Sequence, residues 1–252
     1  MIGRKDFVDY LNNLLACADF NDYAPNGLQV EGRREIRRIC TAVTASAESI
    51  EKAVQFEADA LLVHHGYFWK GESPLIIGSK YQRIAQLINH QINLLAYHLP
   101  LDCHPELGNN ACLANLLQLE DIHRHSASGT PGLLWAGSFS LPKTTDEVTV
   151  LLTDKLGRKP LLVEGTGHSI SKIAWCTGAA QDYIEQAHSL GADAYISGEI
   201  SERTYYQARE LGIHYFSAGH HATERFGIQA LGEHLAKKFD LQYQFIDSSN
   251  PV

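Results

Sequence analysis

The sequence contains no apolar run that approaches the roughly 18 residues needed to span a bilayer, so we expect no membrane-spanning segment. Its first residues, MIGRKDFVDYLNNLL, carry acidic side chains within an apolar periodicity and include no small-residue cleavage site. This pattern predicts an amphipathic helix rather than a signal peptide. The five cysteines are odd in number and form no C-x-x-C pair, which favours reduced thiols in a cytoplasmic protein.

An excess of positive charge is also missing, because the formal net charge is −8. Binding to nucleic acid depends on clustered Lys and Arg, so the negative charge argues against a protein that coats nucleic acid. Arg33, Arg34, Arg37 and Arg38 do cluster, but acidic residues flank them and favour a solvated face. A phosphate loop of P-loop type is absent as well. Any triphosphate would therefore have to be held by Lys and Arg side chains and by metal ions.

The chain repeats itself. Residues Ile39–His65 align without gaps to Ile173–Glu199, with eight identities that include an Ala-Asp-Ala run in both copies. Each copy reads as an apolar strand, a small-residue turn, an amphipathic helix and a second apolar strand, which predicts a β-α-β unit. A further helix and strand follow each copy, so we expect an α/β fold with two related lobes and mainly parallel or mixed sheets.

The region between the lobes has a different pattern of apolar and polar residues and does not repeat the β-α-β unit. We expect a helix at 109–117, a polar loop at 123–132 and a strand at 134–141. A second helix at 146–156 and a second strand at 160–163 should follow. We therefore interpret the chain as a first lobe at 1–114, an inserted segment at 115–168 and a second lobe at 169–252. The second lobe would complete the functional site.

Three apolar strands end in residues that bind metals. The candidate residues are His64 and His65, then His98 and Asp102, then His220 and Glu224. Ligands of open α/β sheets lie beyond the carboxyl ends of the strands. Imidazoles and carboxylates are the ligand set of Zn²⁺, Mn²⁺ or Fe²⁺. The second copy of the repeat has Gly198-Glu199 in place of the histidine pair, so we expect an asymmetric site to which the second lobe contributes only His220 and Glu224.

Each of these features also has a simpler explanation. A lone histidine beside an apolar strand is usually a satisfied core or surface residue, and an i,i+4 pair such as His220 and Glu224 can be a helix-surface contact. The stripe from Glu224 continues through Ile228, Leu231 and Leu235, however, and therefore points to a core. The coincidence of three polar strand ends favours metal binding over separate explanations.

The number of candidate ligands favours two ions. Five ligands exceed the four of a structural zinc site, so two divalent ions per chain that share a carboxylate fit better, and Glu224 is the expected bridge. His98 and Asp102 are also four residues apart, although Pro100 disfavours a regular helix there. His98 is the candidate catalytic residue, as a proton shuttle close to the ligands.

Four segments carry a resemblance to a known family: DYAPNGLQVEG, VHHGYFWKGESP, YHLPLDCHPELGNNA and SAGHHATERFGIQAL. With these motifs the chain resembles the NIF-three-like proteins, described as type 2 homologues of GTP cyclohydrolase 1, and especially their bacterial YbgI-type branch. The resemblance implies that His64, His65, Asp102, His220 and Glu224 hold two metals between two α/β lobes. It also implies a toroidal homohexamer.

The expected function is that of a metal-dependent hydrolase acting on a nucleotide or purine compound, including damaged nucleotides. A bound ion lowers the pKa of water toward ~7, and a cyclohydrolase needs the resulting hydroxide to open the imidazole ring of guanine. Two alternatives remain open at this point. One is a metal-binding ring scaffold or regulatory protein without turnover, and the other is an iron-dependent oxidase. The identity of the metal and its open coordination positions would discriminate among the three.

Overall fold

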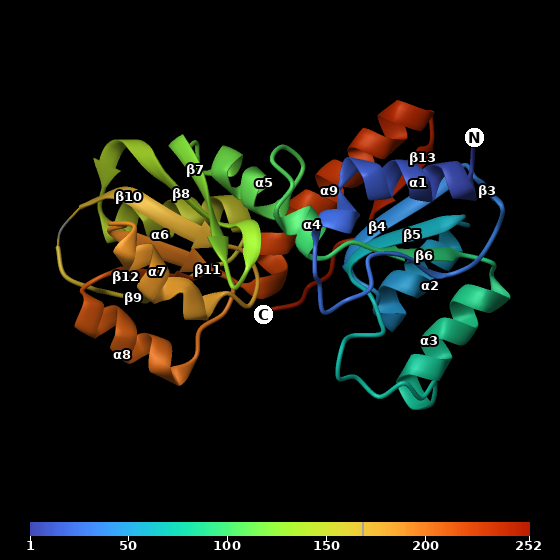
Figure 1. Ribbon diagram of the computed structural model, residues 1–252, viewed down its shortest axis with the longest axis horizontal. Coiled ribbons are helices and arrows are strands. Elements are labelled where there is room, and N and C mark those ends of the chain that lie inside the picture. Colours follow the sequence, from blue (N-terminus) through green and yellow to red (C-terminus); the bar gives the residue numbers. More distant parts are fainter. Residues whose placement is uncertain (168) are drawn as a thin grey trace. The chain divides into compact units, whose positions relative to one another are not determined.

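The structure is a computed structural model that describes residues 1–167 and 169–252, and it has a mixed α/β fold (Figure 1). The chain forms two compact units. The first unit comprises Met1–Gly108 and Gly227–Ser249, and the second comprises Asn109–Phe226 and Asn250–Val252. Each unit is built around its own sheet, so each has a separate core.

The first unit contains a five-stranded sheet in the order β13-β4-β5-β6-β2. Four neighbouring strands are parallel, and β2 runs antiparallel to β6. The strands of this unit are β1 (Ile2–Gly3), β2 (Gly27–Val30), β3 (Glu35–Ile36), β4 (Arg38–Thr44), β5 (Ala60–His65), β6 (Asn93–Ala96) and β13 (Gln242–Phe245). Its helices are α1 (Arg4–Leu14), the 3₁₀ helix Cys17–Asp19, α2 (Ala47–Gln55), α3 (Gly78–Asn89), α4 (Leu99–Asp102) and part of α9 (His220–Phe239).

Helices cover both faces of the first sheet (Figure 1). Phe7 and Leu11 of α1 pack with Leu231 of α9 on one face, and Ile50 of α2 packs with Leu87 of α3 on the other. Successive strand residues point to opposite faces of the sheet, and helices bury both faces. The strand sequences are therefore apolar at nearly every position instead of alternating. The amphipathic amino-terminal helix predicted from the sequence is confirmed, since Phe7 and Leu11 are completely buried.

The second unit contains a six-stranded sheet in the order β7-β8-β10-β11-β12-β9. Its three central neighbours β10, β11 and β12 are parallel, and the outer pairings are antiparallel. The strands are β7 (Glu120–Ala127), β8 (Thr130–Lys143), β9 (Leu161–Val163), β10 (Ile170–Cys176), β11 (Ala194–Ser197) and β12 (His214–Ser217). The helices are α5 (Asn109–Leu116), α6 (Thr145–Leu156), the 3₁₀ helix Gln181–Tyr183, α7 (Ile184–Ser189) and α8 (Glu202–Leu211).

The two copies of the sequence repeat adopt the same β-α-β connectivity. Strands β4 and β5 are parallel around α2, and β10 and β11 are parallel around α7. The register is also the same, because Ile39 pairs with Ala60 and the aligned Ile173 pairs with Ala194. The expected following helix and parallel strand are present in both copies, as α3 and β6 and as α8 and β12. The prediction of duplicated β-α-β units is confirmed.

The division of the chain differs from the expected segments 1–114, 115–168 and 169–252. Strands β7, β8 and β9 of the middle segment join the sheet of the second unit instead of forming a separate piece. The end of the chain returns to the first unit, where β13 pairs with β4. Ile228, Leu231 and Leu235 pack there in the core, so the apolar stripe of α9 accounts for this return.

The polar stretch 123–132 is not a loop, and that expectation was wrong. It contributes to a hairpin in which β7 pairs with the beginning of β8. Ser128 and Gly129 have φ angles of 47° and 79°, and positive φ at both central residues is typical of a type I′ hairpin turn. Because β7 is an edge strand that is mostly exposed, its residues are polar and resemble a loop in composition.

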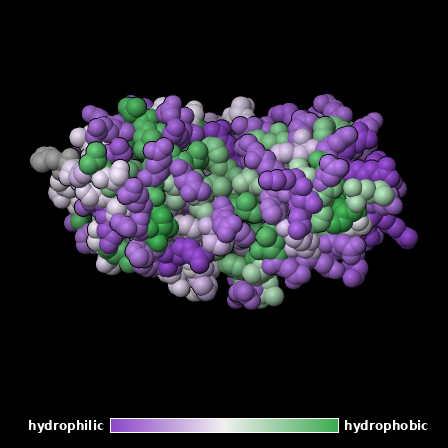
Figure 2. Space-filling view, turned by 90° about the horizontal axis from the view of Figure 1, so that it is seen from above, coloured by the Kyte–Doolittle hydropathy of each residue, from purple (hydrophilic) through white to green (hydrophobic). Residues whose placement is uncertain are grey.

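The face of the molecule seen from above is mainly polar. Figure 2 shows hydrophilic side chains over most of the visible face, with apolar patches scattered between them. Among the described residues, we find no helix that combines the length and the apolar character needed to cross a membrane.

A capping box at the start of α6 gives a test of local stability. The Thr144 side chain accepts a hydrogen bond from the Glu147 N–H at the start of α6, and Glu147 accepts one from the Thr144 N–H in return. We expect Thr144→Ala to lower the free energy of unfolding by about 1 kcal/mol, because an N–H loses its partner. Urea denaturation followed by circular dichroism measures this. Thr153→Ala, inside the same helix, is the control and should change stability less.

Candidate metal centre

In the first unit, three imidazoles and a carboxylate lie at the carboxyl edge of the sheet, because His64 and His65 end β5 while His98 and Asp102 follow β6. The ring centroids of His64 and His65 are 4.5 Å apart, and those of His64 and His98 are 5.1 Å apart. One nitrogen from each of these three rings lies within 4.8 Å of the others. His64, His98 and Asp102 are 0%, 6% and 5% exposed, and such burial of polar groups is typical of ligands rather than of surface residues.

The hydrogen bond of His64 determines which of its ring nitrogens can bind a metal. Nδ1 lies 2.9 Å from the carbonyl oxygen of Tyr97, and a carbonyl oxygen can only accept, so Nδ1–H donates. In the neutral ring the lone pair is then on Nε2, which lies 3.5 Å from Oδ1 of Asp102. A fixed imidazole lone pair beside a carboxylate oxygen gives two atoms that could hold a metal ion.

Asp102 reaches this position on a short helix, α4, which the sequence interpretation disfavoured. The N–H of Asp102 donates to the carbonyl oxygen of His98 over 3.1 Å, so one helical turn connects the two residues. Pro100 interferes less than expected because it lies at the start of α4, where a backbone N–H has no partner within the helix.

His98 is oriented by Asp22, a residue for which the sequence suggested no role. Nδ1–H of His98 donates to Oδ1 of Asp22 over 2.9 Å, and Oδ2 of Asp22 accepts from the Leu99 N–H and from Asn26. Burial would raise the pKa of Asp22, but the hydrogen bond and charge of His98, with the bonds from Asn26 and Leu99, lower it to about 2. Asp22 therefore stays ionised and leaves Nε2 of His98 as the atom available for a proton or a ligand.

In the second unit, His220 and Glu224 form a second pair at the start of α9, beyond the end of β12. Nδ1–H of His220 donates to Oε1 of Glu199 over 2.6 Å, and Nε2 lies 3.1 Å from Oε2 of Glu224. Burial would lower the pKa of His220, but hydrogen bonds and charges of Glu224 and Glu199 raise it to about 9. The two carboxylates thus favour a positive charge at Nε2, and a metal cation can take the place of the proton.

Glu199 is a further residue that sequence reasoning missed. In the alignment of the two repeat copies it occupies the position of His65, and the sequence interpretation assigned no part of the site to it. The second copy has Gly198-Glu199 where the first copy has the histidine pair, so the two strand ends carry different side chains. The sequence interpretation named only His220 and Glu224 in this lobe, and the structure adds Glu199, which orients His220. Its alignment with His65, at the equivalent position of the duplicated unit, was the signal that could have identified Glu199 as a site residue.

Gly178 makes room for the Glu224 carboxylate. Its φ is +71°, and a Cβ at this position would overlap Oε1 of Glu224. The Gly178 N–H donates to the hydroxyl of Thr223, which in turn donates to the carbonyl of Gly219. Thr223 therefore connects the turn after β10 to the first turn of α9 and keeps Gly178 against Glu224.

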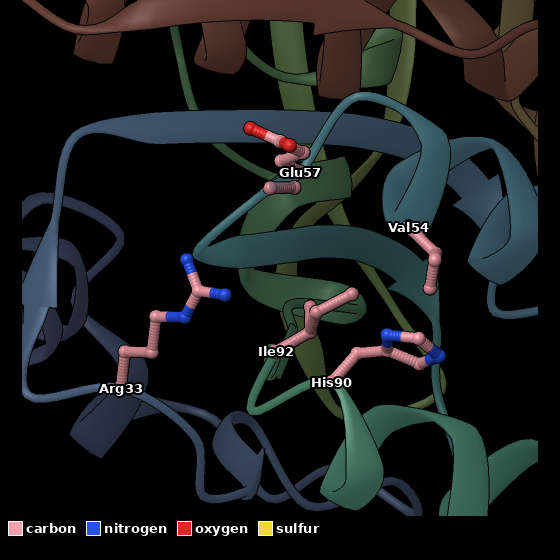
Figure 3. A pocket seen from close by; sticks show the side chains of 6 residues that line it. Arg33, Val54, Glu57, His90 and Ile92 are labelled. Atoms are coloured by element: carbon pink, nitrogen blue, oxygen red, sulfur yellow. The ribbon is translucent and has the colours of Figure 1, made fainter.

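A cavity of about 390 Å³ lies at the other edge of the first sheet, near the amino ends of β5 and β6. It is lined by Arg33, Val54, Glu57, Ala58, His90 and Ile92, and Figure 3 shows Arg33 extending toward its centre. Arg33 pairs with Asp59 at 2.9 Å, and Glu57 pairs with Arg38 at 2.7 Å. The charged side chains that line the cavity are thus paired with opposite charges. None of the candidate metal ligands lines the cavity.

Comparison with known proteins identifies the family. The model of the Duf34/NIF3 family (NGG1p interacting factor 3) matches residues 2–251. The chain belongs to the Duf34/NIF3 family. A relative from Allochromatium vinosum, named GTP cyclohydrolase 1 type 2 homolog, is 52% identical over 100% of this chain and 98% of its own length. A relative of the same name from Pseudomonas aeruginosa is 50% identical over 100% of this chain and 99% of its own.

Solved structures with the same fold support this assignment. A structure titled as protein ybgI of unknown function is 46% identical, with a TM-score of 0.95 and complete coverage of both chains. Reduced HcgD from Methanocaldococcus jannaschii is 25% identical, with a TM-score of 0.85 and 98% coverage of each chain. The resemblance inferred from the four sequence motifs is therefore confirmed. This member of the Duf34/NIF3 family carries clusters of His, Asp and Glu suited to metal binding.

Proposed function

We propose that this Duf34/NIF3 protein is a metal-dependent hydrolase of purine nucleotides or related compounds and binds two divalent ions, Zn²⁺, Fe²⁺ or Mn²⁺, per chain. The proposed ligands are His64, His65, Asp102, His220 and Glu224. One observation carries the proposal. In each unit a histidine has its Nδ1 fixed by an acceptor, and its Nε2 faces a carboxylate at 3.5 Å or 3.1 Å. Tautomers fixed in this way, with carboxylates beside them, are typical of metal sites.

The donor set fits divalent ions of intermediate hardness. It combines imidazole nitrogens with carboxylate oxygens and includes no thiolate, which suits Zn²⁺, Fe²⁺ and Mn²⁺ better than softer metals. Asp102 and Glu224 are 5% and 2% exposed, so a cation would offset the cost of burying their negative charges.

Divalent ions bound here would supply a hydroxide nucleophile near neutral pH and would polarise the substrate. The protein's own contribution is then proton transfer and orientation. His98 holds its Nε2 in a fixed direction, because Asp22 accepts from Nδ1. We assign to this nitrogen the transfer of a proton to or from the reacting group. The name of the relatives, GTP cyclohydrolase 1 type 2 homolog, supports a purine nucleotide as the substrate.

The test combines metal content with turnover. Protein purified without chelator should contain about two transition-metal ions per chain after saturation, as elemental analysis measures. Incubation with GTP and other purine nucleotides should give product that disappears after EDTA treatment and returns when metal is added back. His90→Asn, at the cavity far along the sheet from the ligands, is a control that should keep both properties. Retained metal without turnover would favour a scaffold role, and oxygen consumption with iron would favour an oxidase.

We further propose, from the family resemblance, that the protein assembles as a toroidal homohexamer. Light scattering of the purified protein should then give a mass about six times that of one chain, which is 28.0 kDa. A monomeric mass at micromolar concentration would contradict this proposal and would leave the metal ligands unaffected.

Asp22→Asn tests the role assigned to His98. The amide keeps the size of the side chain but removes the charged acceptor, and its NH₂ group can turn toward Nδ1. We expect turnover to fall by roughly 10–100-fold because the imidazole loses its orientation. Metal content should stay at the parental value, since Asp22 is not a proposed ligand. Loss of metal together with turnover would show instead that His98 itself binds an ion.

A further inference from the structure

An aromatic pair, Tyr23 and Trp69, lies beside the imidazoles of the first unit. The Trp69 ring centroid is 5.1 Å from that of His98 and 5.9 Å from that of His65. The Tyr23 ring centroid is 5.0 Å from that of His98 and 5.7 Å from that of Trp69. Tyr23 precedes β2 and Trp69 follows β5, so the fold brings the two rings together beside His98 from distant parts of the sequence.

The pair leaves aromatic surface exposed to solvent. Tyr23 is 53% exposed and Trp69 is partly exposed, whereas the other two tryptophans, Trp135 and Trp175, are 3% and 0% exposed. The rings of Tyr23 and Trp69 are inclined by 38° to each other, so they do not stack face to face and cover each other's surfaces. Exposed faces of large aromatic rings beside a cluster of buried ligands are suited to stacking on a flat ring.

The position of Trp69 is fixed before any ligand arrives. Its indole N–H donates to the carbonyl of Gly66 over 3.1 Å, and its backbone N–H donates to Glu72 over 3.1 Å. The neighbouring Lys70 N–H donates to the carbonyl of Tyr23 over 2.7 Å, which connects the two segments. A side chain held in place in this way loses little conformational entropy when it binds a ligand.

From this arrangement we propose that Trp69, with Tyr23, forms a stacking surface that holds the purine ring of the substrate beside His98 and His65. The choice of a purine rests on the proposed function, while the aromatic pair itself requires only a planar heterocycle. A purine has apolar faces that stack on indole, and its edges carry hydrogen-bonding groups that polar neighbours can contact. Trp69 is thus a positioning residue that contributes to substrate specificity.

The test measures binding of guanosine 5′-monophosphate to the Zn²⁺-loaded protein by calorimetry. Trp69→Leu keeps an apolar side chain but removes the aromatic surface, and we expect it to weaken binding by roughly 10–100-fold. Trp69→Phe loses the hydrogen bond to Gly66 but keeps an aromatic face. Because stacking requires only that face, the affinity of Trp69→Phe for the nucleotide should stay close to parental. Phe68→Leu is the matched control, because Phe68 lies in the same loop and its ring contacts Tyr67 and Lys80 instead of the imidazoles. Ribose 5-phosphate, which lacks the base, should bind Trp69→Leu and the parent equally.

Tryptophan fluorescence gives a second readout. The nucleotide should quench the emission of the parent and of Phe68→Leu, but not that of Trp69→Phe, in which the remaining tryptophans are buried. The proposal is overturned if the parent does not bind the nucleotide, if Trp69→Leu binds as tightly as the parent, or if Trp69→Phe loses as much affinity as Trp69→Leu. Binding through Trp69 without hydrolysis would contradict the proposed activity alone. Hydrolysis with an unchanged KM in Trp69→Leu would contradict the stacking surface alone.

Discussion

Glu224→Gln should leave the protein folded and lower its affinity for at least one divalent ion by ~10–100-fold or more. The amide keeps nearly the same volume but removes the negative charge that faces Nε2 of His220 at 3.1 Å. Glu224 is 2% exposed, so water compensates little for the lost carboxylate. The measurement is a metal titration of the variant beside the parent, with circular dichroism to confirm folding.

Glu233→Gln provides the control for this experiment. Glu233 lies on the same helix, is exposed, and accepts a hydrogen bond from Gln229, so its replacement should leave metal affinity unchanged. If folded Glu224→Gln binds both ions at parental affinity, Glu224 is not a ligand and the proposed site is wrong.

Gly178→Ala should produce a comparable loss of metal affinity without changing any proposed ligand. The added Cβ would overlap the Glu224 carboxylate and force it away from His220. The φ of +71° is also unfavourable for alanine, so stability should fall by about 1 kcal/mol from this cause alone. Metal titration and urea denaturation of the same sample measure the two effects.

Gly157→Ala separates these two causes. Gly157 has nearly the same φ, +73°, but a Cβ there would meet only Arg225 at 3.7 Å, which is an ordinary contact. We expect Gly157→Ala to lose stability through its backbone conformation and to keep parental metal affinity. Equal metal affinities in Gly178→Ala and Gly157→Ala would show that the carboxylate has room to move, and that Gly178 does not position it.

The sequence was sufficient to predict the β-α-β units and the candidate ligands, because both depend on local pattern. Apolar strands buried on both faces stand out in composition, and polar residues directly after them are conspicuous. The helical face of α9 was predictable for the same reason, since Ile228 and Leu231 follow Glu224 at helical spacing and are fully buried.

The residues that orient His98 and Glu224 could not be predicted in the same way. Asp22 is separated from His98 by most of the first unit's sequence, and only the fold brings the two together. Gly178 resembles any turn glycine until the Glu224 carboxylate is placed against it. The hairpin at β7 was missed for a different reason. An exposed edge strand lacks the buried face that makes strands recognisable in sequence.

Because α9 belongs to both units, the order of synthesis constrains the order of folding. The chain leaves the first unit after Gly108 and returns to it only at Gly227. The core around Phe7 and Ile39 needs Leu231 and Leu235 of α9, and β4 needs β13 as its neighbour. A nascent chain that has left the ribosome only as far as the second unit therefore exposes an apolar sheet face. The first unit, although it begins the sequence, is the last to be completed.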